Sequence, residues 1–175
     1  DGIFVFETQY GKDVLERNLL DTIYHEHLSY FNIKPMVSFF ASLGMVIFDV
    51  IPVDSKGGSI RVFVARADCR RPVAPVVSQM AIKEERFGCY NPVTYSQFGD
   101  AISAIRDQLI ALIDLEKVKG KKIAGYGVSV GTLALMPQFD LADKLDFLVD
   151  DNPIRDPLLR GANYSIPVYQ SDALY

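Results

Sequence analysis

Both histidines of the chain lie in one short aromatic segment, DTIYHEHLSYF, at residues 21–31. Imidazole is the side chain whose unperturbed pKa, about 6.5, lies nearest neutrality, so a histidine in this segment is suited to moving protons. Packing explains the same residues in another way, with the tyrosines, Leu28 and Phe31 in the core and His25 and His27 as their solvated neighbours. Taken alone, the segment favours packing.

A second candidate site is formed by three glycines, Gly125, Gly127 and Gly131, between an expected strand and an expected helix. Small residues there let a phosphate or ribose approach the backbone, and the helix N-terminus offers free N–H groups. Asp150 and Asp151 end the next strand, about where a nucleotide-binding βαβ unit places its ribose-binding carboxylate. The spacing G-x-G-x-x-x-G departs from the dinucleotide pattern, which weakens the case for a nicotinamide cofactor. A tight turn without a ligand is the alternative.

The composition excludes several classes of protein. With 49% apolar residues, 23% charged residues and a net charge of −4 in 175 residues, the chain has a globular composition. Its basic residues are scattered, so we expect no nucleic-acid partner. No apolar run is long enough for a membrane span, and no signal peptide is present, so we expect a cytoplasmic protein. Cys69 and Cys89 are interpreted as reduced thiols, and no metal site is expected.

The elements that must position these residues follow from periodicity and from turn residues. The patterns predict strands at residues 2–10, 45–53, 59–67, 121–126 and 145–150, and helices at 32–44, 75–88, 94–120 and 129–139. The short turn at 54–58 favours an antiparallel pair of the strands that flank it. The βαβ pattern from residue 121 to 150 requires a parallel sheet.

The order of these elements predicts an α/β protein with two parts. Strand, helix and antiparallel hairpin match the end of a class I methyltransferase sheet, and a small Rossmann-like parallel α/β domain follows. The linker at 68–75 is the expected boundary, giving domains at 1–70 and 71–175. The strands that would begin a methyltransferase sheet are expected upstream of residue 1.

Four segments, in this order along the chain, carry a resemblance to a known family: DTIYHEHLSYF (21–31), KGGSIRVFV (56–64), GYGVSVGTL (125–133) and LDFLVDDNP (145–153). They resemble the sugar C-methyltransferases, which act on nucleotide-linked keto-deoxysugars with S-adenosylmethionine. That family has an N-terminal zinc-binding part, a central methyltransferase domain and a C-terminal Rossmann-like domain. The resemblance implies that this chain is the end of the second part plus most of the third. The S-adenosylmethionine site would then lie mostly outside the chain, and we expect the isolated chain to be inactive.

The resemblance also implies catalytic roles. His27 would be the general base that removes a proton from the carbon beside a ketone, and Tyr24 and Glu26 would line the sugar site. A positioned base contributes on the order of 10² to 10⁴ in rate. If the segment were helical, Tyr24 and His27 would share a face, and the tyrosine O–H could support the developing oxyanion. His25 is interpreted as structural.

The substrate implied by the resemblance is a nucleotide-linked keto-deoxysugar such as a dTDP-sugar. The residues expected to bind it are Ser59, Arg61, Gly125, Tyr126, Gly127, Ser129, Asp150 and Asn152. A surface ion pair is the alternative interpretation of Arg61. The family carries a lysine in the glycine turn that GYGVSVG lacks, which puts phosphate binding by this turn in doubt. The chain also ends before the last strand that the second domain is expected to need.

Two other functions compete with the enzymatic one. The second part could be a non-catalytic Rossmann-like module that binds a nucleotide or nucleotide-sugar. A fragment of an NAD-dependent oxidoreductase is a further alternative, supported only by the glycine turn and Asp150.

Overall fold

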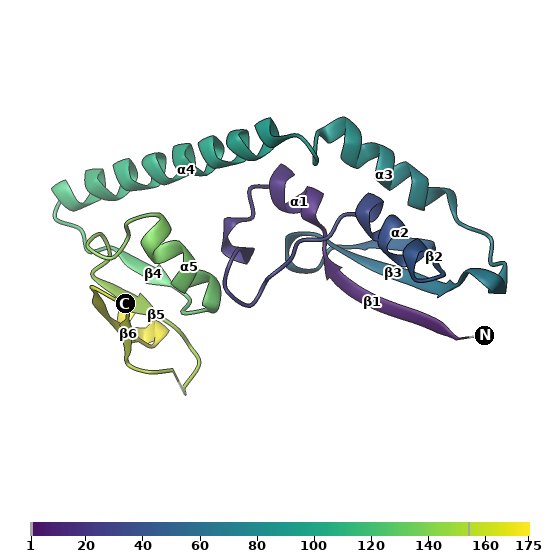
Figure 1. Ribbon diagram of the computed structural model, residues 1–175. Coiled ribbons are helices and arrows are strands. Elements are labelled where there is room, and N and C mark those ends of the chain that lie inside the picture. Colours follow the sequence, from purple (N-terminus) through teal and green to yellow (C-terminus); the bar gives the residue numbers. More distant parts are fainter. Residues whose placement is uncertain (1, 154) are drawn as a thin grey trace. The chain divides into compact units, whose positions relative to one another are not determined.

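The computed structural model describes residues 2–153 and 155–175 and divides the chain into two compact units (Figure 1). The first unit holds the segment that ends at Leu19 together with His27–Asp100, and the second holds Leu20–Glu26 with Ala101–Tyr175. Within the described residues the fold is mixed α/β, with a three-stranded and a four-stranded sheet. The predicted fold class is therefore confirmed.

The division between the units falls inside helix α4 (Pro92–Val118), after Asp100. The sequence patterns place it earlier, at residues 68–75. Helix α3 (Pro75–Phe87), which follows that linker, belongs to the first unit because residues such as Val77 are buried in its core. A change of composition at prolines does not reveal on which sheet the next helix packs.

The first sheet contains β1 (Ile3–Gln9), β3 (Ser59–Arg66) and β2 (Met45–Val53), in that spatial order. The middle strand β3 runs antiparallel to both neighbours, which confirms the antiparallel pair predicted for β2 and β3. The turn between them forms a short 3-10 helix, η2 (Ser55–Gly57), in which Lys56 adopts a left-handed conformation with φ 50°. β1 and β2 therefore run in the same direction on either side of β3.

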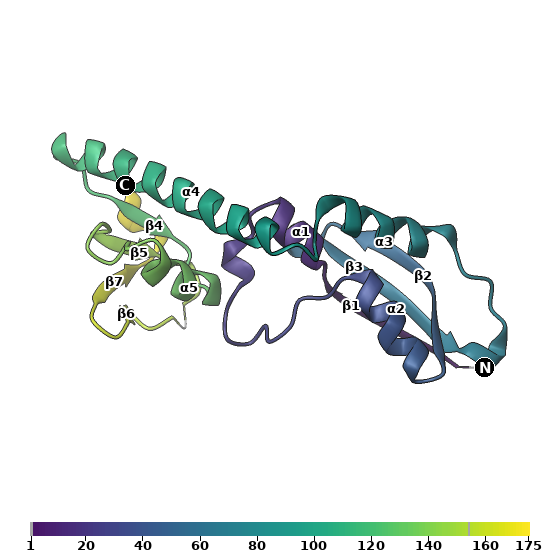
Figure 2. The ribbon, with the colours of Figure 1, turned by 45° about the horizontal axis from the view of Figure 1, so that its top comes forward.

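Helices α2 (Ile33–Ser42) and α3 pack on one face of this sheet (Figure 2). Side chains alternate between the two faces of a strand, so Ile60, Val62 and Val64 of β3 all point to the helices. They are fully buried there, together with side chains such as Met36 of α2. The residues between them in β3 face the other side of the sheet.

The carboxylate of Glu84 on α3 connects most elements of the first unit, and it is completely buried. It accepts hydrogen bonds from the hydroxyls of Tyr10, at 2.9 Å, and Tyr90, at 2.5 Å. It also accepts from the backbone N–H groups of Ile33, at 2.6 Å, and Lys34, at 3.0 Å, which begin α2. A negative charge at a helix N-terminus satisfies unpaired N–H groups and interacts favourably with the helix dipole. The first unit is thus built around one capped helix and two anchored tyrosines.

The environment of this carboxylate changes the acidity of its neighbours. Burial, assisted by the charge of Glu84, raises the pKa of the Tyr10 and Tyr90 hydroxyls well above the ordinary value. The same two causes raise the pKa of the buried Cys89 thiol to about 11. All three groups are therefore neutral at physiological pH.

The short helix α1 (Gly11–Glu16) was not among the predicted elements. Its first turn is capped from a distance, because the side-chain oxygen of Asn32 accepts a hydrogen bond from the Lys12 backbone N–H at 2.9 Å. The Gly11 N–H donates to the carbonyl of Phe31 at 2.8 Å. A cap supplied from twenty residues away leaves no local sequence signal.

The second unit is built on a sheet whose strands lie in the spatial order β4 (Ala124–Tyr126), β5 (Phe147–Val149), β7 (Ser165–Tyr169) and β6 (Leu158–Arg160). β4, β5 and β7 are parallel, and β6 is antiparallel to β7. Helix α5 (Val130–Gln138) connects β4 to β5, which confirms the predicted βαβ unit. The sequence analysis did not predict β6 and β7.

No helix in residues 2–153 and 155–175 is long and apolar enough to cross a membrane. The 27-residue helix α4 carries ionic side chains on its exposed surface, and Asp114 pairs with Lys144 at 2.6 Å. Ile113, by contrast, is buried in the second unit.

Replacing Glu84 by leucine is expected to lower the free energy of unfolding of the first unit by about 3 kcal/mol or more. Four donors would lose their acceptor, and each unsatisfied buried donor costs roughly 1–3 kcal/mol. The measurement is a urea titration in which alkylation of Cys89, protected in the folded unit, reports unfolding. Glu85→Leu is the matched control, because the exposed Glu85 makes only a surface ion pair with Lys34. Equal urea midpoints for the two variants would contradict the role assigned to Glu84.

Candidate functional site

The segment that contains both histidines forms a turn and an irregular loop rather than a helix. The helical relation considered for Tyr24 and His27 therefore does not apply. The residues up to Glu26 belong to the second unit, with the short 3-10 helix η1 (Leu20–Thr22), and His27 belongs to the first. Tyr24 and Glu26, which were predicted to line the sugar site, are thus grouped with the other unit.

The two histidines differ in their surroundings. The side chain of His25 is 80% exposed, and its Nε2 lies 3.9 Å from a carboxylate oxygen of the exposed Glu26. His27 is partly buried, with its ring edge-on to that of Tyr30 at 6.4 Å between centroids. His27 lines a pocket.

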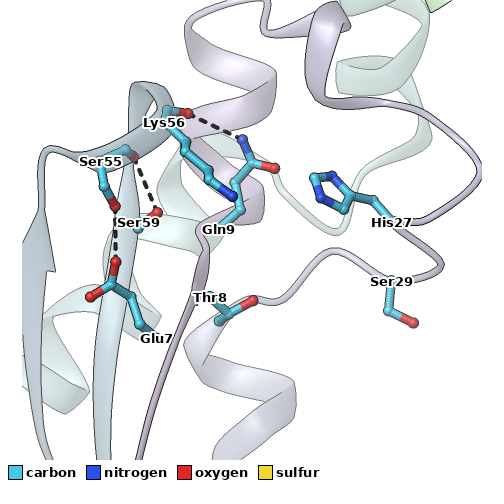
Figure 3. Close-up of a pocket in the computed structure, with 8 residues that line it drawn as sticks. All are labelled: Glu7, Thr8, Gln9, His27, Ser29, Ser55, Lys56 and Ser59. Atoms are coloured by element: carbon cyan, nitrogen blue, oxygen red, sulfur yellow. Dashed lines mark hydrogen bonds between the residues drawn. The ribbon is translucent and has the colours of Figure 1, made fainter. Parts of the chain in front are cut away.

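That pocket has a volume of about 330 Å³ and belongs wholly to the first unit (Figure 3). Its lining consists of polar side chains from β1, the loop after His27 and the turn before β3: Glu7, Thr8, Gln9, His27, Ser29, Ser55, Lys56 and Ser59. The pocket brings His27 together with Ser59, two of the residues predicted from the sequence. Hydroxyl, amide, ammonium and imidazole groups thus share one hollow.

Strand alternation explains why the wall is polar. Glu7 and Gln9 lie two apart on β1, and they pair with Arg61 and Ser59 of β3. These positions alternate with Ile60 and its apolar neighbours, which point to the helices, so they occupy the opposite face of the sheet.

Arg61 forms an ion pair rather than offering a free cation. Its guanidinium donates to one carboxylate oxygen of Glu7 at 2.9 Å, and the Ser55 hydroxyl donates to the other at 2.9 Å. These hydrogen bonds lower the pKa of Glu7, Arg61 first and Ser55 second, so Glu7 stays charged in the folded protein. This geometry agrees with the alternative interpretation, in which Arg61 forms a surface ion pair.

The glycine turn between β4 and α5 satisfies its own polar groups. Gly127 has φ +97°, a conformation that side chains disfavour. The Ser129 hydroxyl accepts from the Thr132 N–H at 3.3 Å and so caps α5, while the Thr132 hydroxyl donates to the Gly127 carbonyl at 2.9 Å. A methyl group on Gly125 would come within 2.6 Å of the Leu148 side chain, so this glycine is required by strand packing.

The acidic residues after β5 are also engaged. Asp150 accepts from the backbone N–H groups of Val128, at 2.7 Å, and Asn152, at 2.9 Å, and these bonds lower its pKa. Asp151 accepts from the hydroxyl of Tyr126, which lowers the pKa of Asp151 and raises that of Tyr126. The structure therefore brings Tyr126, Gly127 and the two aspartates together around the turn, as predicted.

A second hollow of about 370 Å³ lies beyond the carboxyl ends of β5 and β7, where open α/β sheets commonly bind ligands. Asp150 and Asn152 line it, and both were predicted from the sequence. Arg155 and Gln170 also line it but were not predicted. Gln170 directly follows β7, which the sequence analysis missed.

The described residues contain no group of three or more His, Cys, Asp or Glu side chains able to hold a metal ion. The polar groups of the glycine turn already have partners in the protein, because Asp150 accepts from the backbone of the turn and Ser129 caps α5. The donor site was expected outside this chain, and no step is assigned to the turn.

Sequence reasoning missed most of the wall around His27, above all Glu7 and Gln9. No alternation marks these positions, because FVFETQ has three apolar residues followed by three polar ones. These residues line the same pocket as His27 because of the conformation of its loop, and no sequence periodicity predicts that conformation.

Comparison with known proteins identifies relatives. Residues 54–175 match the model of the C-methyltransferase C-terminal domain family. C-methyltransferase NovU of Streptomyces niveus is 38% identical over 174 residues, which cover 98% of this chain and 41% of the relative. The chain therefore spans about two fifths of the length of this relative.

Replacing Gly127 by alanine is expected to reduce the free energy of unfolding by roughly 1–2 kcal/mol, because L-residues disfavour positive φ. Gly99→Ala is the matched control, since Gly99 lies in α4 with nothing within 4 Å of an added methyl. That change should stabilise by about 0.5–1 kcal/mol. Chemical denaturation compares the two, and an unchanged Gly127→Ala protein would show that the turn does not need this conformation.

Proposed function

The chain belongs to the family of C-methyltransferase C-terminal domains, and on that premise we propose that it is part of an S-adenosylmethionine-dependent sugar C-methyltransferase. The proposed reaction adds a methyl group to a carbon beside the keto group of a nucleotide-linked deoxysugar. His27 is the general base. The proposed location of the enzyme is the cytoplasm.

The position of His27 in the pocket of the first unit carries this proposal. His27 lines this hollow, and its neighbours there are mainly hydroxyl and amide side chains. Such groups suit a ligand that presents several hydroxyls and a carbonyl, as a keto-sugar does. Lys56 adds a positive charge at the same wall for an anionic part of the ligand.

The chemistry assigned to His27 is proton removal from carbon. A C–H beside a ketone is acidic enough for an imidazole base, and the electron pair that remains forms an enolate. S-adenosylmethionine would supply the methyl group for that enolate carbon. The negative charge that develops on the ketone oxygen requires a hydrogen-bond donor, and the pocket offers the Lys56 ammonium.

A nucleotide-binding module without chemistry is the second candidate. It is favoured by the hollow beyond β5 and β7, which lies at the usual ligand position of a parallel sheet. In the leading proposal the same hollow helps to hold the nucleotide of a dTDP-sugar. The two candidates therefore differ in whether His27 takes part in a reaction.

In the complete enzyme, His27→Gln is expected to lower kcat/KM by about 10² to 10⁴, the usual contribution of a general base. The same substitution at the exposed His25 is the control and should leave activity near that of the unchanged enzyme. Two readouts are needed: methyl transfer, and exchange of the substrate proton with deuterated water. Equal activity in the two variants would remove His27 from the reaction.

Nucleotide binding can be measured on this chain by thermal unfolding with dTDP, NAD and S-adenosylmethionine in parallel. A site present only in the folded state should stabilise it by about 2.7 kcal/mol at a hundredfold excess over the dissociation constant. We expect stabilisation by dTDP and none by the other two. Stabilisation by NAD alone would favour the oxidoreductase alternative instead.

A further inference from the structure

We propose that Gln9 is a positioning residue for His27: its amide oxygen accepts a hydrogen bond from one ring N–H, which assigns the role of base to the other ring nitrogen. The inference rests on the proposed role of His27 as the base. It assigns a function to a strand residue that neither the sequence motifs nor the family match singles out.

The orientation of the Gln9 amide is fixed by its nitrogen. Nε2 donates to the backbone carbonyl of Lys56 at 3.3 Å, and only the N–H side of an amide can make that bond. The amide oxygen must then point the other way, and Figure 3 shows it directed toward the imidazole of His27. This oxygen is buried and has no hydrogen-bond partner among the residues that the structure describes.

A buried acceptor without a partner is rare in native proteins and is unfavourable. The imidazole is the ring system that this oxygen faces in the pocket, and a neutral imidazole always carries one N–H. The proposed hydrogen bond runs from that N–H to the Gln9 oxygen. The same bond would satisfy the acceptor and select one tautomer.

The strand beneath Gln9 is rigid enough to hold this oxygen in place. Gln9 pairs with Ser59 in the sheet, and the next residue, Tyr10, donates its backbone N–H to the carbonyl of Gly58 at 3.2 Å. The hydroxyl of Tyr10 is bound to the buried Glu84. Positioning groups work best on such fixed elements, because a loop would let the acceptor drift.

The neutral amide has a chemical consequence that a carboxylate would not have. The charged side chains that line the pocket are Lys56 and Glu7, and Glu7 is neutralised by Arg61. An added negative charge against His27 would favour its protonated form, which cannot accept a proton. A glutamine fixes the ring and leaves the charge of the pocket unchanged.

The test uses the 15N signals of the imidazole nitrogens, which distinguish the two tautomers and the protonated form. The chain has only two histidines, so the exposed His25 serves as a reference in every spectrum. In the unchanged chain we expect His27 to populate one tautomer, unlike His25. In Gln9→Leu, the tautomer ratio of His27 should move to that of His25.

Gln9→Glu tests the charge argument, since a carboxylate in the same place should shift the protonation midpoint of His27 to higher pH. Gln79→Glu is the matched control, because Gln79 is an exposed residue of α3 and does not line the pocket. The control should leave both histidines unchanged. If neither Gln9 variant alters the His27 signals, or if the control alters them as much, the inference is overturned.

Kinetics of the complete enzyme separate this inference from the proposed function. Gln9→Leu should lower kcat by about 10- to 100-fold, the usual effect of losing a group that orients a functional histidine, with KM changed less. In Gln9→Glu the acidic limb of the pH–rate profile should move to higher pH. If His27 keeps one tautomer but His27→Gln leaves the activity unchanged, the positioning role of Gln9 is retained and the role of His27 as the base is rejected. If His27→Gln abolishes activity but the Gln9 variants leave kcat unchanged, only the positioning role of Gln9 is rejected.

Discussion

The buried carboxylate of Glu84 is the interaction on which the first unit depends. Its four hydrogen bonds join the end of β1, the start of α2, helix α3 and the residues before α4. A charge removed from water is tolerable only when every lone pair has a donor, and here two hydroxyls and two backbone N–H groups supply them. The raised pKa of the neighbouring tyrosines follows from the same arrangement, because ionising either one would place a second negative charge beside the first.

This constraint reaches the pocket through two short stretches of chain. Tyr10, anchored by Glu84, directly follows Gln9, and α2, capped by Glu84, begins directly after the loop that carries His27. Tyr10 and Phe31 also form a parallel bridge, which ties the strand to the end of that loop. The two sides of the pocket are therefore fixed to one buried group, although neither side contacts it. Such an arrangement lets an exposed loop present a functional side chain in a reproducible place.

The sequence predicted the parts of the fold that local rules govern. Apolar and β-branched content with turn residues located β1, β2 and β3, proline and glycine signals located the helices around them, and helical spacing located α4. The two compact units divide within α4, whereas the sequence patterns place a boundary at residues 68–75, because the packing of α3 on the first sheet has no local signal. The same limit explains the site. The motif pointed to His27 and Ser59, but Gln9 and Glu7 meet them only through strand register and the conformation of an aperiodic loop.

The glycine turn shows why spacing alone is a poor guide to ligands. Its glycines, Ser129 and Asp150 are the residue types of a phosphate- and ribose-binding turn, yet each has a structural task in this protein. Asp150 holds two backbone N–H groups, Ser129 caps a helix, and Gly125 makes room for Leu148. GYGVSVG contains no lysine or arginine, so the turn has no cationic side chain of its own for a phosphate. The hollow beyond β5 and β7 lies close to this turn, and in its lining the Arg155 guanidinium pairs with Asp150 at 3.3 Å. A nucleotide held by the second unit would therefore be bound from the strand ends rather than by the glycines.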